Sequence, residues 1–171
     1  AKNIIVIDVS NPLSPSVQQT KPMNNIIDMI VDKNGKLFVA TKDSLSVFDL
    51  SSNLSLLVTV LPPINLFNDF VAVEQYKDTI YTYVSGLSGG VYKYRYNGSN
   101  QLTQIITYPH PIVNYAPRHL AVDSFGIYLS YVEQGLYAYN KQTMVQTGYY
   151  RHGMEFVHNF LWGPQDLFCK D

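Results

Sequence analysis

The sequence predicts an all-β protein, a β-propeller with four blade-equivalents, and three observations carry this prediction. Apolar and polar residues alternate through many short runs, as they do in strands that bury one face. No run of useful length shows the apolar i, i+3, i+4, i+7 spacing of a helix. Two sequence patterns recur at a spacing close to the roughly 40–50 residues of a propeller blade.

The first recurring pattern is a strand that ends in a polar residue. Its four copies are NIIVID, SLSVFD, GVYKYR and GLYAYN, which end at Asp8, Asp49, Arg95 and Asn140. These ends lie 41, 46 and 45 residues apart along the chain. The near-equal spacing places one such strand in each successive blade.

The second pattern is an acidic residue, a turn, and an aliphatic-aromatic pair that opens the next strand. The acids are Asp32, Glu74 and Asp123, and the pairs are Leu37-Phe38, Ile80-Tyr81 and Ile127-Tyr128. A last copy keeps Leu167-Phe168 but has Trp162 in place of the acid. Because turn signals such as Asn34-Gly35 separate the runs, each unit is expected to form a meander of four strands.

The repeats predict three complete blades and two half-blades. We expect an outer half-blade over residues 1–22, complete blades over 23–62, 63–110 and 111–153, and an inner half-blade over 154–171. Radial stacking buries the faces that a single blade leaves exposed. The two halves together make one blade, so either they pair to close a four-bladed ring or the chain is part of a larger propeller.

Composition indicates one folded domain and excludes several partners. The chain has 171 residues, 46% of them hydrophobic and 15% charged, with a formal net charge of -1. This near-neutral charge gives no electrostatic footprint for nucleic acid or an anionic membrane surface. No stretch approaches the roughly 18 apolar residues of a membrane span. The opening AKNIIVIDVS has no Met and no signal-type leader, so we expect a piece cut from a longer or processed protein.

The first unit, IIVIDVSNPLSPSVQQT, resembles the LVIVD repeat. It has an aliphatic strand ending in Asp8, then Val9-Ser10-Asn11-Pro12, a Pro15 and a following strand. Residues 37–60 look like a more diverged copy, and RHLAVDSFGIYLS over 118–130 is similar to the inner strands of YVTN-, NHL- and lactonase-type propellers. The LVIVD resemblance implies a surface or secreted protein, and it brings no catalytic residues to carry over.

The innermost strand of each blade is expected to face the central channel, so polar residues at its start are candidate site residues. These are Asp28, Asp69 (beside Phe70), His119 and His158. Histidines and carboxylates that converge there could bind a divalent metal, whose bound water could attack an ester. The alternative, that they cap the channel and hydrogen-bond strand ends or water, is favoured because the mixed residues are not a matched ligand set.

Two further residues near these positions have a structural and a functional interpretation. Arg118, beside His119, could orient an anionic ligand, but pairing with a neighbouring carboxylate such as Asp69 is favoured. Cys169 is the only cysteine, so no internal disulfide is possible. It aligns with Val39 on an inner strand, where a free cysteine behaves as a small hydrophobic residue rather than a nucleophile.

Asn53 and Asn97 each begin an Asn-x-Ser sequon. Both fall in the turn expected between the outer two strands of a blade, where a glycan would be tolerated if the protein is secreted. The tyrosines at 92, 94 and 96 alternate along one strand and are expected to pack between blades.

These observations predict a non-enzymatic propeller module for protein binding or self-assembly, extracellular or at a cell surface. Open strands at the two ends would invite β-augmentation by another chain or copy. The alternative is a metal-dependent, lactonase-like hydrolase with its site at the channel. Since the chain has no Gly-rich phosphate loop, HExxH or GxSxG motif, no cofactor is expected apart from the divalent metal of that alternative.

Overall fold

The computed structural model describes residues 2–61, 68–76, 79–86, 90–108, 117–131, 134–143, 145–150, 159–162 and 167–170. Within these ranges the chain forms sixteen strands in five antiparallel sheets and no helix. The prediction of an all-β protein is therefore confirmed. The described part also contains no helix long and apolar enough to cross a membrane.

The sheets follow one another along the chain as a half-blade, three complete blades and a second half-blade. The first half-blade contains β1 (Lys2–Asp8) and β2 (Ser16–Met23). The first blade contains β3 (Ile26–Val31), β4 (Lys36–Thr41), β5 (Leu45–Asp49) and β6 (Ser55–Val60). The second contains β7 (Asn68–Tyr76), β8 (Thr79–Gly86), β9 (Gly90–Tyr96) and β10 (Leu102–Tyr108). The third contains β11 (Pro117–Val122), β12 (Gly126–Tyr131), β13 (Gly135–Asn140) and β14 (Gln146–Tyr150). The last hairpin contains β15 (Asn159–Trp162) and β16 (Leu167–Lys170).

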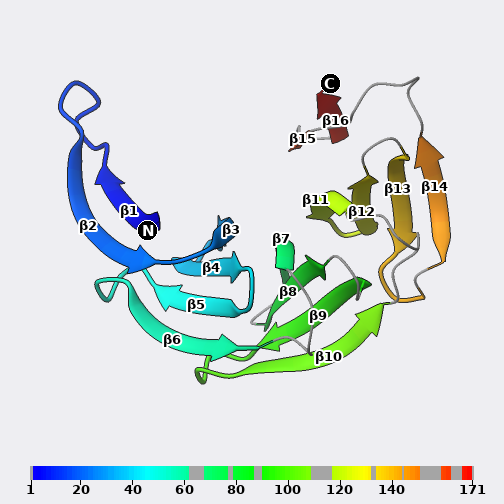
Figure 1. Ribbon diagram of the computed structural model, residues 1–171, viewed down its shortest axis with the longest axis horizontal. Coiled ribbons are helices and arrows are strands. Elements are labelled where there is room, and N and C mark those ends of the chain that lie inside the picture. Colours follow the sequence, from blue (N-terminus) through cyan, green and yellow to red (C-terminus); the bar gives the residue numbers. More distant parts are fainter. Residues whose placement is uncertain are drawn as a thin grey trace.

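The blades are arranged as an open arc around a common centre (Figure 1). The first strand of each unit, β3, β7, β11 and β15, lies toward the centre, and β2, β6, β10 and β14 lie at the rim. Consecutive inner strands contact one another, β3 with β7, β7 with β11, and β11 with β15. The two half-blades are separate two-stranded sheets at opposite ends of the arc. The described strands of the two half-blades do not pair with each other, so this structure does not show a closed four-bladed ring.

Three of the interfaces between neighbouring blades are apolar cores in the described part of the chain. Alternation along β4 sends Leu37 and Val39 to the side of the first half-blade, where they pack with Ile4 of β1. Phe38 and Ala40 point to the opposite side and pack against the second blade. The second blade contributes the tyrosines at 92, 94 and 96 to this core, as the alternation predicted. A third core joins Val91 of the second blade to β11, β12 and β13.

The polar residues of the two repeated patterns hold the hairpin turns. The Asp32 carboxylate accepts hydrogen bonds from the backbone N–H groups of Asn34 (2.9 Å) and Lys36 (2.7 Å). Asp123 does the same in the third blade, with the N–H groups of Phe125 (2.7 Å) and Gly126 (2.8 Å). Such side chains replace backbone partners that a tight turn cannot supply, which explains why an acid recurs at this place.

Three of the four strand-ending residues of the first pattern act in the same way. Asp8, Asp49 and Asn140 each accept a hydrogen bond from the N–H of the residue two positions later, at 2.8–2.9 Å. These bonds begin the turn into the outermost strand of the first half-blade, the first blade and the third blade. The bond from Ser10 also lowers the pKa of Asp8 below its ordinary value.

Candidate functional site

The predicted channel-mouth residues lie at a backbone irregularity that recurs in every complete blade. The register between the innermost strand and its neighbour shifts at one residue, which is Ile27 in β3, Asp69 in β7 and Arg118 in β11. The residue that follows the shift is Asp28, Phe70 or His119, and its Cα partners are Ala40, Ser85 and Ser130 respectively. Because β-bulges re-aim side chains, this end of the inner strands departs from regular alternation in each blade.

The structure describes the side chain of one of these candidates. Asp28 is half-buried, and its Oδ1 accepts a hydrogen bond from the N–H of Met29 at 2.9 Å. For Asp69, Arg118 and His119 the described part is the backbone, and His158 lies outside the described residues. Asp69 and Arg118 occupy the same bulge position on β7 and β11, two strands in contact. Among the described side chains, no group of three His, Cys, Asp or Glu could hold a metal ion.

The two sequon asparagines are exposed at the turns between the outer two strands. Asn53 lies between β5 and β6 with a φ of 55°, and Asn97 lies between β9 and β10. Asn97 Oδ1 accepts the N–H of Ser99 at 3.0 Å. The neighbour of Asn53, Leu54, is buried in the core with β1 and β4. Cys169 lies on β16, of which the backbone is described.

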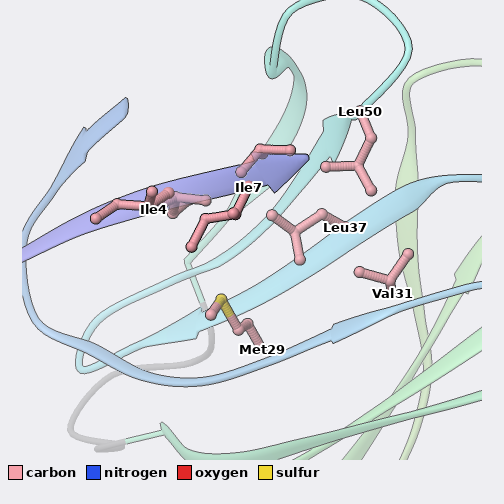
Figure 2. A pocket seen from close by; sticks show the side chains of 8 residues that line it. Ile4, Ile7, Met29, Val31, Leu37 and Leu50 are labelled. Atoms are coloured by element: carbon pink, nitrogen blue, oxygen red, sulfur yellow. The ribbon is translucent and has the colours of Figure 1, made fainter. Parts of the chain in front are cut away.

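Sequence reasoning did not identify a groove beside β1 (Figure 2). The groove has a volume of about 370 Å³. All its lining residues are apolar: Ile4, Ile5, Val6, Ile7, Met29, Val31, Leu37 and Leu50. Figure 2 shows the β1 side chains of Ile4 and Ile7 next to Leu37 and Leu50, with Met29 and Val31 extending the same surface along β3. None of these lining side chains carries a charge.

The groove exists because the first half-blade has no inner strands of its own beside β3 in the described part of the chain. Met29 and Val31 pair with Val39 and Leu37, so their side chains lie on the face of the blade that points toward β1–β2. Both are 51% exposed. In the next blade, β7 contacts both β3 and β4, and β11 contacts both β7 and β8. The groove therefore occupies the place that the inner two strands of the preceding blade take elsewhere in the arc.

Lys21 makes polar contacts from the half-blade to the first blade, and an ion pair joins two strands within the first blade. Lys21 Nζ on β2 donates a hydrogen bond to the backbone oxygen of Leu54 at 2.7 Å and lies 5.0 Å from the centre of the Phe48 ring. Lys36 Nζ and Asp49 Oδ2 form an ion pair at 2.8 Å between β4 and β5. The Lys36 hydrogen bond, with a smaller contribution from Ser51, lowers the pKa of Asp49 to about 2.

A signal for the groove was present in the sequence, although it takes two observations to see it. The repeats assign residues 1–22 to the outer half of a blade. The apolar residues Met29 and Val31, at alternate positions of β3, lie on the face that an inner half would cover. Together they predict an uncovered apolar strip at this place in the fold.

Comparison with known proteins identifies the fold. No protein-family model matches the chain, and no curated protein matches it. The β-propeller domain of Myceliophteria thermophila Cps50 (Swd1) is 11% identical with a TM-score of 0.74, over 98% of this chain and 60% of that one. The computationally designed Ika4 protein is 11% identical with a TM-score of 0.58, over 86% of each chain.

A third similar structure is that of BBS1N, determined in complex with ARL6DN. It is 15% identical with a TM-score of 0.56, over 80% of this chain and 43% of that one. The chain thus spans less than two thirds of the Swd1 and BBS1N chains, and most of the Ika4 chain. Likenesses at these identities show the fold alone, and the fold they show is a β-propeller.

Proposed function

We propose that this chain is a non-enzymatic propeller module that binds protein, and that the binding takes place by self-association at the groove beside β1. One observation carries the proposal. Among the described strands, β1 pairs with β2 alone, and the strip along its other edge is the apolar groove. An incoming strand can extend the sheet there and bury the groove at the same time.

Most of the β1 edge lacks the side chains that keep strand edges from pairing, although Lys2 and Asp8 are charged at its two ends and the register of the β1–β2 pairing shifts after Val6. Natural edges are blunted by lysine, proline or inward-pointing charges. Between Asn3 and Ile7, β1 carries none of these. Ile5 and Ile7 are 51% and 52% exposed, and Val17 on β2 is 62% exposed. Burial of such side chains is favourable by roughly 25 cal/mol per Å² of apolar surface removed from water, so this edge favours association.

Two further observations support protein binding over chemistry. BBS1N, which shares this fold, was determined in complex with another protein, ARL6DN. The groove is lined by aliphatic side chains, which bind by burial and offer no acid, base or nucleophile. We therefore assign no reaction and no resident cofactor to the chain. Stoichiometric metal in the purified protein, lost in a His119→Ala variant, would contradict this part of the proposal.

We place the protein outside the cell or at a cell surface. The support is the resemblance of residues 4–20 to the LVIVD repeat and the exposure of both sequon asparagines, Asn53 and Asn97. Detection of the native protein on intact source cells or in their medium tests this location, and finding it only inside them would overturn it.

Sedimentation velocity over a range of protein concentrations tests self-association at the groove. We expect the wild-type chain to associate, and Val31→Asp to weaken the association by at least about tenfold because it buries a carboxylate among apolar groups. Leu56→Asp is the matched control, since Leu56 is 53% exposed on β6 and does not line the groove. The proposal is overturned if the wild type stays monomeric, or if both variants weaken association equally.

A further inference from the structure

The sequence contains two Asn-Gly steps, and both lie in hairpin turns: Asn34-Gly35 before β4 and Asn97-Gly98 after β9. At such a step the backbone nitrogen of the glycine can attack the side-chain amide carbon of the asparagine, because glycine has no Cβ that blocks the approach. Both glycines have a positive φ, 73° and 78°, and a Cβ built on either would meet no atom within 4 Å beyond its chain neighbours. Space and backbone conformation are therefore alike at the two steps, and their hydrogen bonds distinguish them.

Hydrogen bonds occupy the reacting nitrogen in the first of these turns. The Gly35 N–H donates to the backbone oxygen of Asp32 at 3.3 Å. The Asp32 carboxylate also holds the N–H groups on both sides, those of Asn34 and Lys36, at 2.9 and 2.7 Å. The Asn34 side-chain oxygen accepts no hydrogen bond from the residues that the structure describes. Attack by the Gly35 nitrogen therefore requires this turn to open first.

The second turn presents the amide carbon of Asn97 for attack. The Gly98 N–H makes no hydrogen bond to any residue in the described ranges, whereas Asn97 Oδ1 accepts the N–H of Ser99 at 3.0 Å. Because this donor and acceptor are two residues apart, the bond folds the Asn97 side chain over the Gly98 peptide. Negative charge develops on Oδ1 when a nucleophile attacks Cγ, and the Ser99 N–H already points at that oxygen. Asn97 and Gly98 are both exposed, so water reaches the site.

We propose that Asn97 is a self-modification site, where the chain converts its own asparagine to an acid without an enzyme. The Gly98 nitrogen loses its proton and bonds to Cγ of Asn97, the bond from Cγ to Nδ2 breaks, and ammonia leaves with that proton. Water then opens the cyclic imide. Attack at Cγ restores the normal backbone with an aspartate, and attack at the backbone carbonyl carbon leaves an isoaspartate, in which the chain continues through Cγ. The sum consumes water and releases ammonia, with no oxidant or reductant.

The reaction changes the surface of the second blade permanently. It adds a negative charge at the exposed turn between β9 and β10, in a chain whose formal net charge is -1. It destroys the Asn-x-Ser sequon, so a chain that has reacted can no longer accept a glycan at Asn97. The isoaspartate also lengthens the backbone directly after Tyr96, whose Cα partner across the hairpin is Leu102. These effects do not depend on self-association at the groove, and the inference stands without it.

Peptide mapping of the folded protein, made in bacteria so that it carries no N-linked glycan, measures the reaction. The protein is incubated at mildly alkaline pH in water labelled with heavy oxygen, then cleaved and analysed by mass spectrometry. We expect Asn97 to gain heavy oxygen at least about tenfold faster than Asn34, because an aligned N–H donor stabilises the oxyanion at Asn97 alone of the two. Asn34 is the matched control, since it has the same following residue and a similar glycine φ. Labelling of the Asn97 peptide by protein isoaspartyl methyltransferase identifies the rearranged product.

The same chain unfolded in urea separates the effect of the structure from that of the Asn-Gly sequence. Without the turns the two steps should react at similar rates, since neither the nitrogen nor the oxygen has a fixed partner. Equal rates at Asn34 and Asn97 in the folded protein would overturn the inference, as would an Asn97 that stays intact there while the unfolded chain reacts. A difference that persists unchanged in urea would assign it to neighbouring residues rather than to the Ser99 hydrogen bond, and would also overturn it.

Discussion

The carboxylate of Asp49 ties the end of β5 to the start of β4 and begins the next turn. It pairs with Lys36 at 2.8 Å, and it accepts hydrogen bonds from the N–H and hydroxyl of Ser51 at 2.9 and 2.7 Å. These partners lower the pKa of Asp49 to about 2, with Lys36 contributing most. The Lys36 pKa is raised by the same contact. Folding therefore favours the ionised carboxylate of Asp49 over its protonated form.

This shift gives the stability of the protein a pH dependence with a definite sign. A carboxyl whose pKa is lowered on folding stabilises the fold above its ordinary pKa near 3.8, and the contribution is lost as pH falls toward 2. We expect Asp49→Asn to lower Tm at neutral pH, and the difference from wild type to shrink between about pH 4 and 2. Thermal melts by circular dichroism measure this. Asp43→Asn, in the exposed β4–β5 turn, is the control, and a difference that does not change with pH would contradict the assignment.

The roles of single residues were partly readable from the sequence. The recurring acids Asp32 and Asp123 were visible as markers of the repeat, but their role as acceptors for turn amides needed the coordinates. Asp28 and His119 were placed at equivalent inner-strand positions by counting along the chain. The bulge just before each of them could not be read that way, because a register shift depends on the pairing strand and leaves no mark in composition.

At the scale of elements, close approach of β12 and β13 depends on Gly126. This residue pairs with Asn140, and a Cβ built on it would lie 2.7 Å from the backbone oxygen of Tyr139. We expect Gly126→Ala to destabilise the fold by roughly 1–3 kcal/mol, since backbone on one of the two strands must move. Urea unfolding measures the loss. At Gly148 of β14 the nearest atom to a new Cβ is 3.4 Å away, so Gly148→Ala should cost clearly less, and an equal cost would refute the steric explanation.

The strands themselves were predictable because alternation and turn residues are local properties. The groove was not, although its residues read clearly as strand residues. Ile5 and Ile7 on β1, and Met29 and Val31 on β3, have the pattern of ordinary half-buried strands. The pattern within each strand does not show that the two apolar surfaces border one unfilled strip, which appears only when it is combined with the phase of the repeats or seen in the structure. Such a site is defined by a neighbour that is missing, and a single strand carries no signal for that.

At the scale of the whole molecule, the repeats predicted how many blades the chain contains but not the angle between them. That angle is set by the volumes that meet in the cores between blades, such as the tyrosines of β9 against Phe38 of β4. Repeat spacing carries no record of these volumes. The repeats therefore left open whether the two half-blades pair, and in the structure their described strands form separate sheets at opposite ends of the arc (Figure 1).

The strand order within each blade also places the two sequon asparagines, Asn53 and Asn97, at the same end of the propeller. Asn53 and Asn97 lie in turns that join third to fourth strands, at the opposite end of the blades from the bulges at Ile27 and Arg118. When the chain is secreted from eukaryotic cells behind a foreign signal sequence, we expect both asparagines to carry a glycan, since both are exposed. Mass spectrometry before and after enzymatic deglycosylation measures this. Asn53→Gln and Asn97→Gln should each remove one glycan and leave secretion unchanged, because neither side chain packs in a core. Folded, secreted protein with both sequons unmodified would remove the glycan support for an extracellular location and leave the LVIVD resemblance as its remaining basis.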